Sequence, residues 1–449
     1  MTKHRRTLQA LAQQSLVRCV IKMLSDTHYR ILVAATLVML AATVSLADEP
    51  LPQITVPDGF SATVFHPGLG ATRHLAVRDN GDVYVARSFR VERRMFGQKA
   101  AWGALIALRD EDGDGVADIV EPFGPTDITS EARIHNGHLY FSSDQVVYRM
   151  KLDDNLVPKT VAEPLAGGFP MNNSHGTKTL AFDGAGNMYV NSGTPSNACE
   201  SKRMALHAPG LNPCPQRKRS AGIWKFSDGK QNQDQVRDGK RYVTGTRNIV
   251  AMAWNPWADK LYFVMHGRDS IGMLNPDYYS KQDNSEIPAE EFHLAEAGDD
   301  FGWPYTYYDP RTNRRMQDPG YGGDGKTEAD GDYKKPLIAF PAHWAPNDLL
   351  FHSGHNLPAK YAQGAFIVFH GSWNRIPFEQ GGFKVVFVPM QVGRVTGDWE
   401  VFADGFTGSG PVKNPGQSAY RPTGLAEGPD GSIYISEDML GRIWKVSPE

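Results

Sequence analysis

Pairs of short apolar stretches, separated by Asp/Asn/Gly turns, recur along the chain. The second stretch of each pair is rich in Val, Ile, Tyr and Phe, which favour extended backbone, and the turn residues favour tight hairpins. Six such units occur: "HLAVRDNGDVYVAR" (74–87), "ARIHNGHLYFSS" (132–143), "KTLAFDGAGNMYVNSG" (178–193), "VAMAWNPWADKLYFVMHG" (250–267), "YAQGAFIVFHGS" (361–372) and "TGLAEGPDGSIYISED" (423–438). The fifth unit retains little more than its second strand.

Further β segments, such as "GALIALRD", "GIWKFS" and "RIWKVS", lie between the units, and no long segment has a clean helical period. Repeated four-stranded units predict an all-β fold, a six-bladed β-propeller with loop insertions on one face. The largest insertions are expected around residues 195–220, 268–300 and 310–345. An array of β-sandwiches is a weaker alternative because it does not explain the recurring phrase.

The first 47 residues predict a signal peptide rather than part of the fold. Arg30 is followed by the uncharged run "ILVAATLVMLAATVSLA", and small residues precede a cleavage point before Asp48. The run is short for a membrane span, which needs about 20 apolar residues. Translation starting at Met23 would give a shorter leader, and an uncleaved segment acting as a membrane anchor is the alternative. We therefore expect residues 48–449 to form one periplasmic or secreted propeller domain.

Charge and cysteine content narrow the function. The formal net charge is −3, so no basic surface indicates nucleic-acid binding. Cys19 lies in the predicted leader, which leaves Cys199 and Cys214 as an even pair. Export would permit a disulfide between them, and two free thiols are the alternative. No CxxC or CxxCH motif indicates a thioredoxin-like site or attached haem.

Polar residues precede the first strand of several units. In a propeller these positions gather at one end of the central channel, where convergent polar groups suggest a small-molecule site. The residues concerned are His175, Arg247, Asn248, His343 and Arg421. His175 introduces an imidazole, whose unperturbed pKa of about 6.5 suits a general base.

The segment "DEDGDGVADIVE" is a second candidate site. It has the spacing of an EF-hand calcium loop, although its flanks predict strands rather than helices. The oxygen ligands would come from Asp110, Asp112, Asp114, Asp118 and Glu121. We expect a structural Ca²⁺ here, and an ordinary acidic hairpin is the alternative.

Seven phrases, in order along nearly the whole mature chain, resemble the glucose/sorbosone dehydrogenase family. They are "NNSHGTKTLAFDGAGNMYVNSGTPSNAC", "GTRNIVAMAWNP", "HGRD", "DDFGWPYTYYD", "FHGSWNR", "GGFKVVFVP" and "YRPTGLAEGPDGSIYISEDMLGRIWKV". The "SNAC…PCP" loop and "GSWNR" are most similar to the sorbosone-type branch. The resemblance implies a six-bladed propeller that oxidises an aldose or related aldehyde sugar with pyrroloquinoline quinone (PQQ) and Ca²⁺. It also implies an external electron acceptor, a quinone or a cytochrome.

The resemblance assigns roles to individual residues. His175 matches the general base that takes the proton of the sugar's anomeric hydroxyl. Arg247 and Asn248 match a pair at the reactive carbonyl of PQQ, and Arg247 thereby counts as catalytic. Gly267 and Arg268 match residues whose backbone carbonyls bind the Ca²⁺ beside the cofactor.

The cofactor's carboxylates are expected to contact arginines. Arg421 matches one such residue, and Arg375 falls near another, although its loop differs in length. Thr423 stands where the family has a second late arginine, which removes a charge. PQQ is multiply anionic and has no covalent tether, so guanidinium groups suit its carboxylates.

Two other functions remain open at this stage. A Ca²⁺-dependent lactonase-like hydrolase would need carboxylates and amides around a metal in the channel, and no set of acids enters successive inner strands. A non-catalytic ligand-binding propeller is favoured only by the departure at Thr423.

Overall fold

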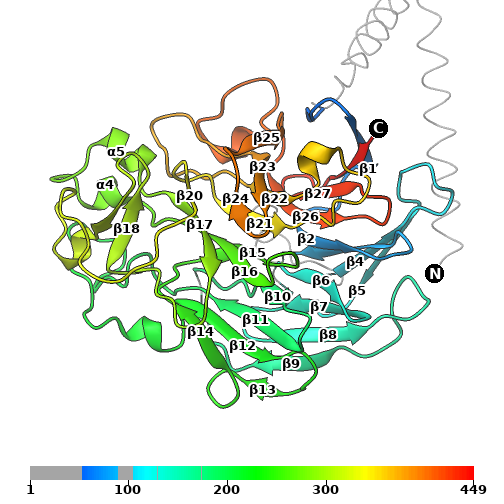
Figure 1. Cartoon of the computed structure of the whole chain (residues 1–449), viewed down its shortest axis with the longest axis horizontal. Helices are drawn as coiled ribbons and strands as arrows, with labels where there is room; N and C mark the ends of the chain where they lie inside the picture. The colour runs from blue at the N-terminus through cyan, green and yellow to red at the C-terminus, as the bar shows by residue number, and fades with distance from the viewer. Residues whose placement is uncertain (1–52, 89–104, 129, 173) are drawn as a thin grey trace, which may run out of the picture. The chain divides into compact units, whose positions relative to one another are not determined.

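Six antiparallel sheets of the computed structural model are arranged around a common axis, and Figure 1 shows their innermost strands around its centre. The structure describes residues 53–88, 105–128, 130–172 and 174–449. The predicted six-bladed propeller is confirmed. The first blade consists of β2 (Thr72–Val77), β3 (Val83–Arg87), β4 (Leu105–Arg109) and β5 (Ile119–Phe123). The second consists of β6 (Ala132–His135), β7 (His138–Ser142), β8 (Val147–Lys151) and β9 (Glu163–Gly167).

The remaining blades follow in chain order. The third consists of β10 (Leu180–Phe182), β11 (Asn187–Ser192), β12 (Gly222–Ser227) and β14 (Lys240–Thr244). The fourth consists of β15 (Ile249–Asn255), β16 (Lys260–Met265), β17 (Glu290–Ala295) and β20 (Ile338–Phe340). The fifth is β21 (Pro346–Leu350), β22 (Gly364–Phe369), β23 (Lys384–Gln391), β25 (Glu400–Ala403), with β24 (Arg394–Val395) beside β23. β13 (Gln233–Asp234) pairs in parallel with β9 of the second blade.

The sixth blade closes the ring with strands from both ends of the described chain. β26 (Pro422–Glu427), β27 (Ile433–Glu437) and β28 (Ile443–Pro448) are completed by β1 (Phe60–His66), which pairs antiparallel with β28. Figure 1 shows the blue and red segments side by side at this point. Closing the ring in this way leaves little exposed sheet edge.

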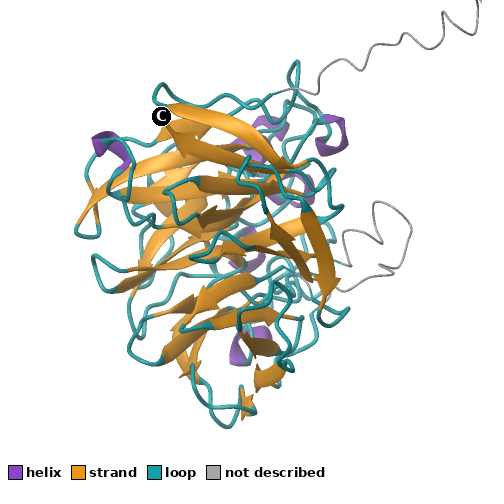
Figure 2. Ribbon diagram, turned by 90° about the vertical axis from the view of Figure 1, so that its right-hand side faces the viewer, coloured by secondary structure: helices purple, strands orange, loops and turns teal. Residues whose placement is uncertain are grey.

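The core lies between neighbouring blades, and Figure 2 shows the blades from the side as successive layers of strands. Alternating Val, Ile, Phe and Tyr residues of each strand point to the two faces of its sheet, so every blade buries both faces. One cluster joins Phe366, Phe387 and Phe402 of the fifth blade to Ile435 and Trp444 of the sixth.

The fifth unit, of which the sequence showed little more than the second strand, forms a complete blade. Its first strand, β21, is joined to β22 by a longer loop instead of a tight Asp/Asn/Gly turn.

Three insertions pack against one another beside the fourth blade. They contain α4 (Ile271–Leu274), α5 (Lys281–Glu286), the hairpin β18 (Thr306–Asp309) and β19 (Arg314–Gln317), and the short 3-10 helices η1 (Pro215–Lys218) and η2 (Pro319–Tyr321). The 3-10 helices η3 (Ala359–Tyr361) and η4 (Pro415–Gln417) lie in the last two blades. The insertions expected at residues 268–300 and 310–345 are shorter than predicted, because these ranges include the blade strands β17 and β20. Backbone bonds from His207 to Leu274 and from Gly210 to Gly320 link the insertions.

The disulfide prediction is confirmed: Cys199 and Cys214 are bridged and buried, beside Trp303. The predicted leader, residues 1–47, lies outside the described residues. Within the described part of the chain, no helix combines the length and hydrophobicity needed to cross a bilayer.

Candidate active site

A polar cavity of about 660 Å³ opens at one end of the propeller axis. Three arginines, three aspartates and three histidines line it: Arg73, Arg247, Arg421, Asp144, Asp269, Asp438, His175, His266 and His370. Its volume is typical of a site for a ligand of cofactor size. Several of the polar positions predicted from the sequence therefore do converge.

Two kinds of position in the inner hairpins supply most of this lining, the residues before the first strand and those after the second. His175 and Arg247 precede the innermost strands β10 and β15, as expected. His266, His370 and Asp438 follow the second strands β16, β22 and β27. In an antiparallel pair, the start of one strand and the end of the next lie at the same edge, so both positions face the cavity.

The imidazole of His175 is held in one orientation. Its Nδ1 donates to the carbonyl oxygen of Thr194 at 2.8 Å, with the Thr194 hydroxyl at 3.0 Å, so the neutral ring keeps its lone pair on Nε2. Burial, followed by the positive charge of Arg247, holds the pKa of His175 well below its ordinary value of 6.5. Nε2 has no partner among the described residues, so His175 offers a neutral proton acceptor to the cavity.

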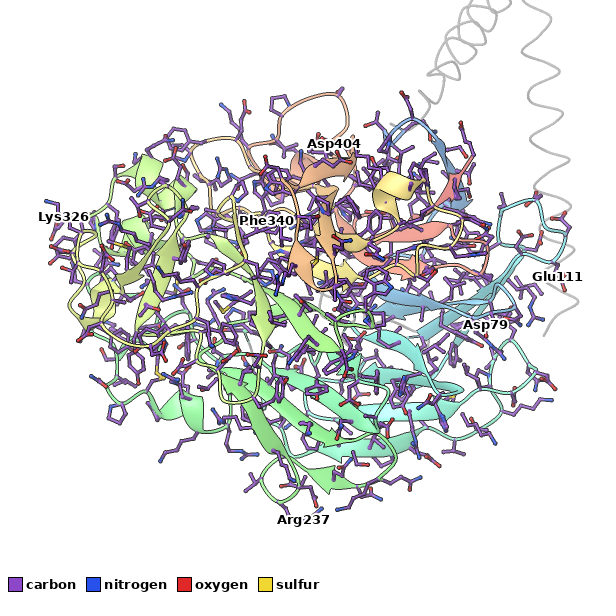
Figure 3. The ribbon with its side chains drawn as sticks, in the orientation of Figure 1. Asp79, Glu111, Arg237, Lys326, Phe340 and Asp404 are labelled. Atoms are coloured by element: carbon purple, nitrogen blue, oxygen red, sulfur yellow. A yellow bond between two sulfur atoms is a disulfide. The ribbon has the colours of Figure 1, made fainter. Side chains whose placement is uncertain are left out.

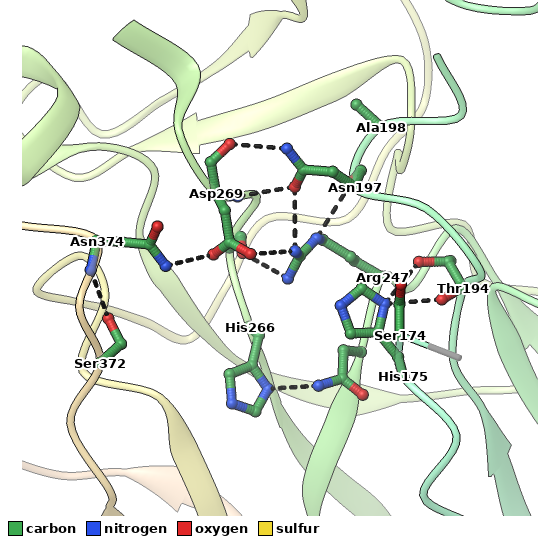
Figure 4. Close-up of polar contacts among 12 residues, drawn as sticks. Ser174, His175, Thr194, Asn197, Ala198, Arg247, His266, Asp269, Ser372 and Asn374 are labelled. Carbon is green, nitrogen blue, oxygen red and sulfur yellow. Dashed lines mark hydrogen bonds and ion pairs between the residues drawn. The ribbon is translucent and has the colours of Figure 1, made fainter. Parts of the chain in front are cut away.

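Arg247 lies in a network of polar contacts (Figure 4). Its Nη2 forms an ion pair with Asp269 Oδ2 at 2.8 Å, and its Nη1 donates to the carbonyl oxygen of Gly267 at 2.9 Å. Asn374 Nδ2 donates to the other Asp269 oxygen at 2.7 Å. Burial opposes ionisation of Asp269, but the charge of Arg247, its hydrogen bond and the neighbouring histidines together lower the pKa of the carboxyl. The result is a fixed guanidinium at the cavity wall.

Asn248 and His266 form the floor beside this pair. Asn248 Nδ2 donates to His266 Nδ1 at 3.2 Å, and burial together with the charge of Arg247 lowers the pKa of His266 to about 3. The buried Oδ1 of Asn248 has no hydrogen-bond partner among the described residues. A buried acceptor without a donor is costly, so this atom suits a hydroxyl of a bound molecule.

The opposite wall holds a second charged cluster. Arg421 Nη2 donates to His370 Nδ1 at 2.9 Å, and His370 Nε2 in turn donates to Asp438 Oδ1 at 2.9 Å. Arg73 donates to the other Asp438 oxygen at 3.0 Å. Burial and the charge of Arg421 lower the pKa of His370 to about 4. Both nitrogens of His370 are thus used within the protein.

The other residues assigned from the resemblance lie away from the cavity lining. Thr423 is buried, and its hydroxyl contacts Thr72 O at 3.3 Å and Ser436 Oγ at 3.0 Å. Arg375 donates from its guanidinium to backbone carbonyls of its own loop and of α5, to Glu379 O at 3.0 Å and to Ser285 O at 2.5 Å. His343 likewise bonds to backbone carbonyls of the α5 segment.

Gly267 and Arg268, whose backbone carbonyls are predicted to bind Ca²⁺, also form contacts within the protein. The Gly267 carbonyl accepts from Arg247, and the Arg268 side chain forms a buried ion pair with Asp318 at 2.6 Å. A cation at the Gly267 carbonyl would therefore compete with the guanidinium of Arg247.

The acidic loop predicted to bind Ca²⁺ joins β4 to β5. Ligand atoms of Asp110, Asp112 and Asp118 lie within 4.8 Å of one another, whereas Asp114 and Glu121 are not part of this group. Backbone N–H groups of Gly113 and Gly115 donate to Asp110. Glu111, in the same loop, lies at the periphery of the molecule in Figure 3.

Sequence reasoning missed six charged or histidine residues of the lining: Arg73, Asp144, His266, Asp269, His370 and Asp438. Five of them follow a second strand, in "SSD", "HGRD", "FHGS" and "SED". The same edge argument applied to the end of the second strand would have found these five. Arg73 lies within β2, where the register shifts between Thr72 and Leu75, and no simple pattern indicates its direction.

Curated relatives match parts of the chain. A protein of Borreliella burgdorferi, described as uncharacterized, is 28% identical over 204 residues, which cover 45% of this chain and 47% of that protein. A pyrroloquinoline quinone-dependent pyranose dehydrogenase of Coprinopsis cinerea is 30% identical over 126 residues, 25% of this chain. That alignment spans only 16% of the relative's length, so these relatives resemble the chain in part.

Solved structures share the fold over most of the chain. The holo form of the pyranose dehydrogenase PQQ domain from Coprinopsis cinerea has a TM-score of 0.68 at 20% identity, covering 90% of this chain and 99% of that one. The calcium structure of the Trichoderma reesei family AA12 enzyme has a TM-score of 0.70 at 18% identity, covering 89% and 98%. The TrAA12-like family model matches residues 54–449, and the chain therefore belongs to the TrAA12-like family.

Proposed function

We propose that the protein is a PQQ-dependent oxidoreductase that oxidises an aldose or another pyranose. The observation that carries the proposal is His175, whose Nε2 lone pair faces a polar cavity lined by three arginines. Family membership and the name of the Coprinopsis cinerea relative support it. A sorbosone-type preference is part of the proposal, on the "SNAC" and "GSWNR" phrases alone.

The residues present fit PQQ. A cavity of about 660 Å³ has room for a tricyclic cofactor and a sugar ring. Arg73 and Arg421 would hold its carboxylates from one wall, and Arg247 and Asn248 would face its quinone end from the other. Arg73, on the neighbouring inner strand, would supply the charge that Thr423 lacks.

Oxidation of a hemiacetal removes a proton from its hydroxyl and a hydride from the adjacent carbon, which leaves a lactone. PQQ, when bound, supplies the hydride acceptor. His175 Nε2 accepts the hydroxyl proton and is ready to do so at neutral pH, because its low pKa keeps the ring unprotonated. Arg247, fixed by Asp269, keeps positive charge where negative charge develops. Asn248 Oδ1 orients a sugar hydroxyl.

We also propose two roles for Ca²⁺. One ion would lie beside the cofactor at the backbone of Gly267 and Arg268, in exchange for the bond from Arg247. A structural ion would bind in the loop of Asp110, Asp112 and Asp118, with the remaining predicted ligands, Asp114 and Glu121, brought in on binding. Removal of Ca²⁺ by a chelator should then lower both cofactor affinity and the melting temperature. In Asp110→Asn, the chelator should still lower cofactor affinity but should lower the melting temperature less than in the wild type.

The proposal places the protein outside the cytoplasm, exported by residues 1–47. Electrons would leave to a separate quinone or cytochrome.

A lactonase-like hydrolase is less favoured by the geometry. Two of the lining aspartates, Asp269 and Asp438, are engaged by arginines. Among the described residues, the one group of acids close enough to hold a metal is the peripheral β4–β5 loop.

The decisive experiment is reconstitution of the purified mature chain. PQQ binding is followed by absorbance titration, and dye reduction is measured with a panel of aldoses, with and without Ca²⁺. We expect saturable PQQ binding and sugar-dependent dye reduction only with PQQ. Absence of both, together with hydrolysis of a sugar lactone, would replace the proposal with the hydrolase.

A further inference from the structure

Asn197 is a buried asparagine that does not line the cavity but contacts two residues that do. It is 7% exposed and belongs to the segment Thr194–Cys199, which follows β11 and enters the insertion closed by the disulfide. Figure 4 shows it above Arg247 and beside Asp269. Neither the family phrases nor the predicted catalytic set assigned it a role.

The amide of Asn197 is bonded to the backbone of Asp269 on both sides. Its Oδ1 accepts from Asp269 N at 2.8 Å, and its Nδ2 donates to Asp269 O at 2.8 Å. This two-point contact resembles a rung of a β-ladder and fixes the main chain from which the Asp269 carboxylate projects. A residue in one insertion thus sets the position of an acid in another.

The same residue holds Arg247. Asn197 Oδ1 accepts from Arg247 Nη2 at 3.0 Å, and the Asn197 carbonyl accepts from Arg247 Nε at 3.2 Å. With the bonds to Asp269 and Gly267, four of the five guanidinium N–H groups are engaged. One Nη1–H remains without a partner among the described residues, so Asn197 determines where that donor lies.

The segment also reaches the base. Thr194, at its start, accepts from His175 Nδ1, and its hydroxyl donates to Ser196 O at 2.7 Å. At its end, Cys199 N donates to Ser196 Oγ at 3.0 Å before the disulfide. Only two residues therefore lie between Thr194, which contacts the imidazole, and Asn197, which contacts the guanidinium.

We propose that Asn197 is a positioning residue that holds the Arg247–Asp269 pair in the geometry that receives the cofactor. The proposal rests on the proposed function for the identity of that cofactor. The positioning itself acts on the chain's own groups, so it has a consequence without any cofactor. Arg247 lies close enough to His175 to lower its pKa, and displacement of the guanidinium must therefore change the titration of His175.

Two substitutions test this. Asn197→Ala removes the three hydrogen bonds of the side-chain amide, two to the Asp269 backbone and one to Arg247 Nη2, and thereby loosens the Arg247–Asp269 pair. Asn197→Asp keeps the volume and the accepted bonds, loses the donation to Asp269 O and adds a negative charge beside Arg247. Asn172→Ala is the matched control, because that buried asparagine binds the backbone of His175 instead, accepting from His175 N at 3.1 Å and donating to Gly193 O at 2.9 Å.

The first measurement is the titration of His175 by NMR in histidine-labelled protein without PQQ. We expect its midpoint to move to higher pH in Asn197→Ala, and further in Asn197→Asp. The other groups that act on this imidazole are His266 and Asp269, which are retained in both variants. The second measurement is PQQ binding by absorbance, which we expect to weaken about 10- to 100-fold in Asn197→Ala, the effect of losing hydrogen bonds to a charged group.

The control separates positioning of the arginine from positioning of the base. Asn172→Ala should lower turnover while PQQ affinity stays near that of the wild type. Wild-type titration midpoints and PQQ affinity in both Asn197 variants would overturn the proposal. If the wild type itself does not bind PQQ, the proposed function fails, and the His175 titration alone decides the role of Asn197.

Discussion

The cavity has two walls that use the same residue types to different effect. On the base side, His175, Arg247 and Asp269 come from the third and fourth blades. On the closure side, His370 and Arg421 come from the fifth and sixth blades, and Asp438 and Arg73 from the sixth and first. Each wall combines a histidine, arginine and aspartate, yet only one can accept a proton from a ligand.

The difference lies in the hydrogen bonds of the two imidazoles. His175 donates from Nδ1 to Thr194 and has no partner for Nε2 within the described part of the chain, whereas His370 accepts from Arg421 and donates to Asp438. Burial lowers the pKa of both rings. A low pKa therefore does not identify a base; an available lone pair at the cavity does.

The walls also differ in how they are supported. The base side depends on an insertion, through Asn197 and the disulfide loop. The closure side is built from strand ends that meet where the first and last blades join, with β1 completing the ring. Perturbing one support should leave the other wall largely intact.

The largest expected effect is on the base. His175→Ala should lower turnover about 10²- to 10⁴-fold, the usual contribution of a positioned acid–base group. PQQ affinity should hardly change, because the arginines remain. Stopped-flow dye reduction at saturating PQQ measures the rate, and the melting temperature controls for folding. Wild-type turnover in folded His175→Ala would move the base to another residue.

Opening the insertion should weaken the base side selectively. Replacing both Cys199 and Cys214 by Ser releases a loop with a sequence separation of 15. A loop of this size corresponds to about 3 kcal/mol of stability. We expect a lower urea midpoint, a higher His175 titration midpoint and an unchanged His370 titration. Equal changes at both histidines would mean that the two walls are not independently supported.

The closure side should determine cofactor affinity. Arg421→Ala and Arg73→Ala should each weaken PQQ binding about 10- to 100-fold, as expected for a lost hydrogen bond to a charged group. Turnover at saturating PQQ should fall less. Arg375→Ala discriminates between two interpretations. The family resemblance predicts weaker PQQ binding in this variant, whereas the contacts of Arg375 to Glu379 O and Ser285 O predict unchanged PQQ binding. Absorbance titration of the three variants decides.

The smallest expected effect is on acid stability. The folded protein keeps His175 neutral, while the unfolded chain binds a proton below pH 6.5, so stability falls as pH drops below that value. Each such histidine contributes about 1 kcal/mol per pH unit in that range. Urea unfolding at pH 7, 6 and 5 should therefore show a shallower pH dependence for His175→Ala than for wild type. Parallel dependences would show that His175 titrates normally in the fold.

The sequence by itself determined the architecture, because each blade is a local hairpin meander. Strand residues such as "IYISE" (433–437) and turns such as "DG" occur within a few residues of one another, and their repetition gives the number of blades. His175, Arg247 and Arg421 were found for the same reason, since the start of an inner strand has a fixed place in a propeller. The sequence also predicted that Cys199 and Cys214 are bridged, and the structure contains this disulfide.

Tertiary structure decided which of these residues meet and what they can do. Arg73 joins Arg421 only because the first and last blades close the ring, and Thr423 fails to face the cavity because its strand buries that side. Asn197 reaches Asp269 across 72 residues of sequence. Such contacts depend on how separate insertions pack, and the protonation state of each histidine depends on those contacts; neither is encoded in a local pattern of residues.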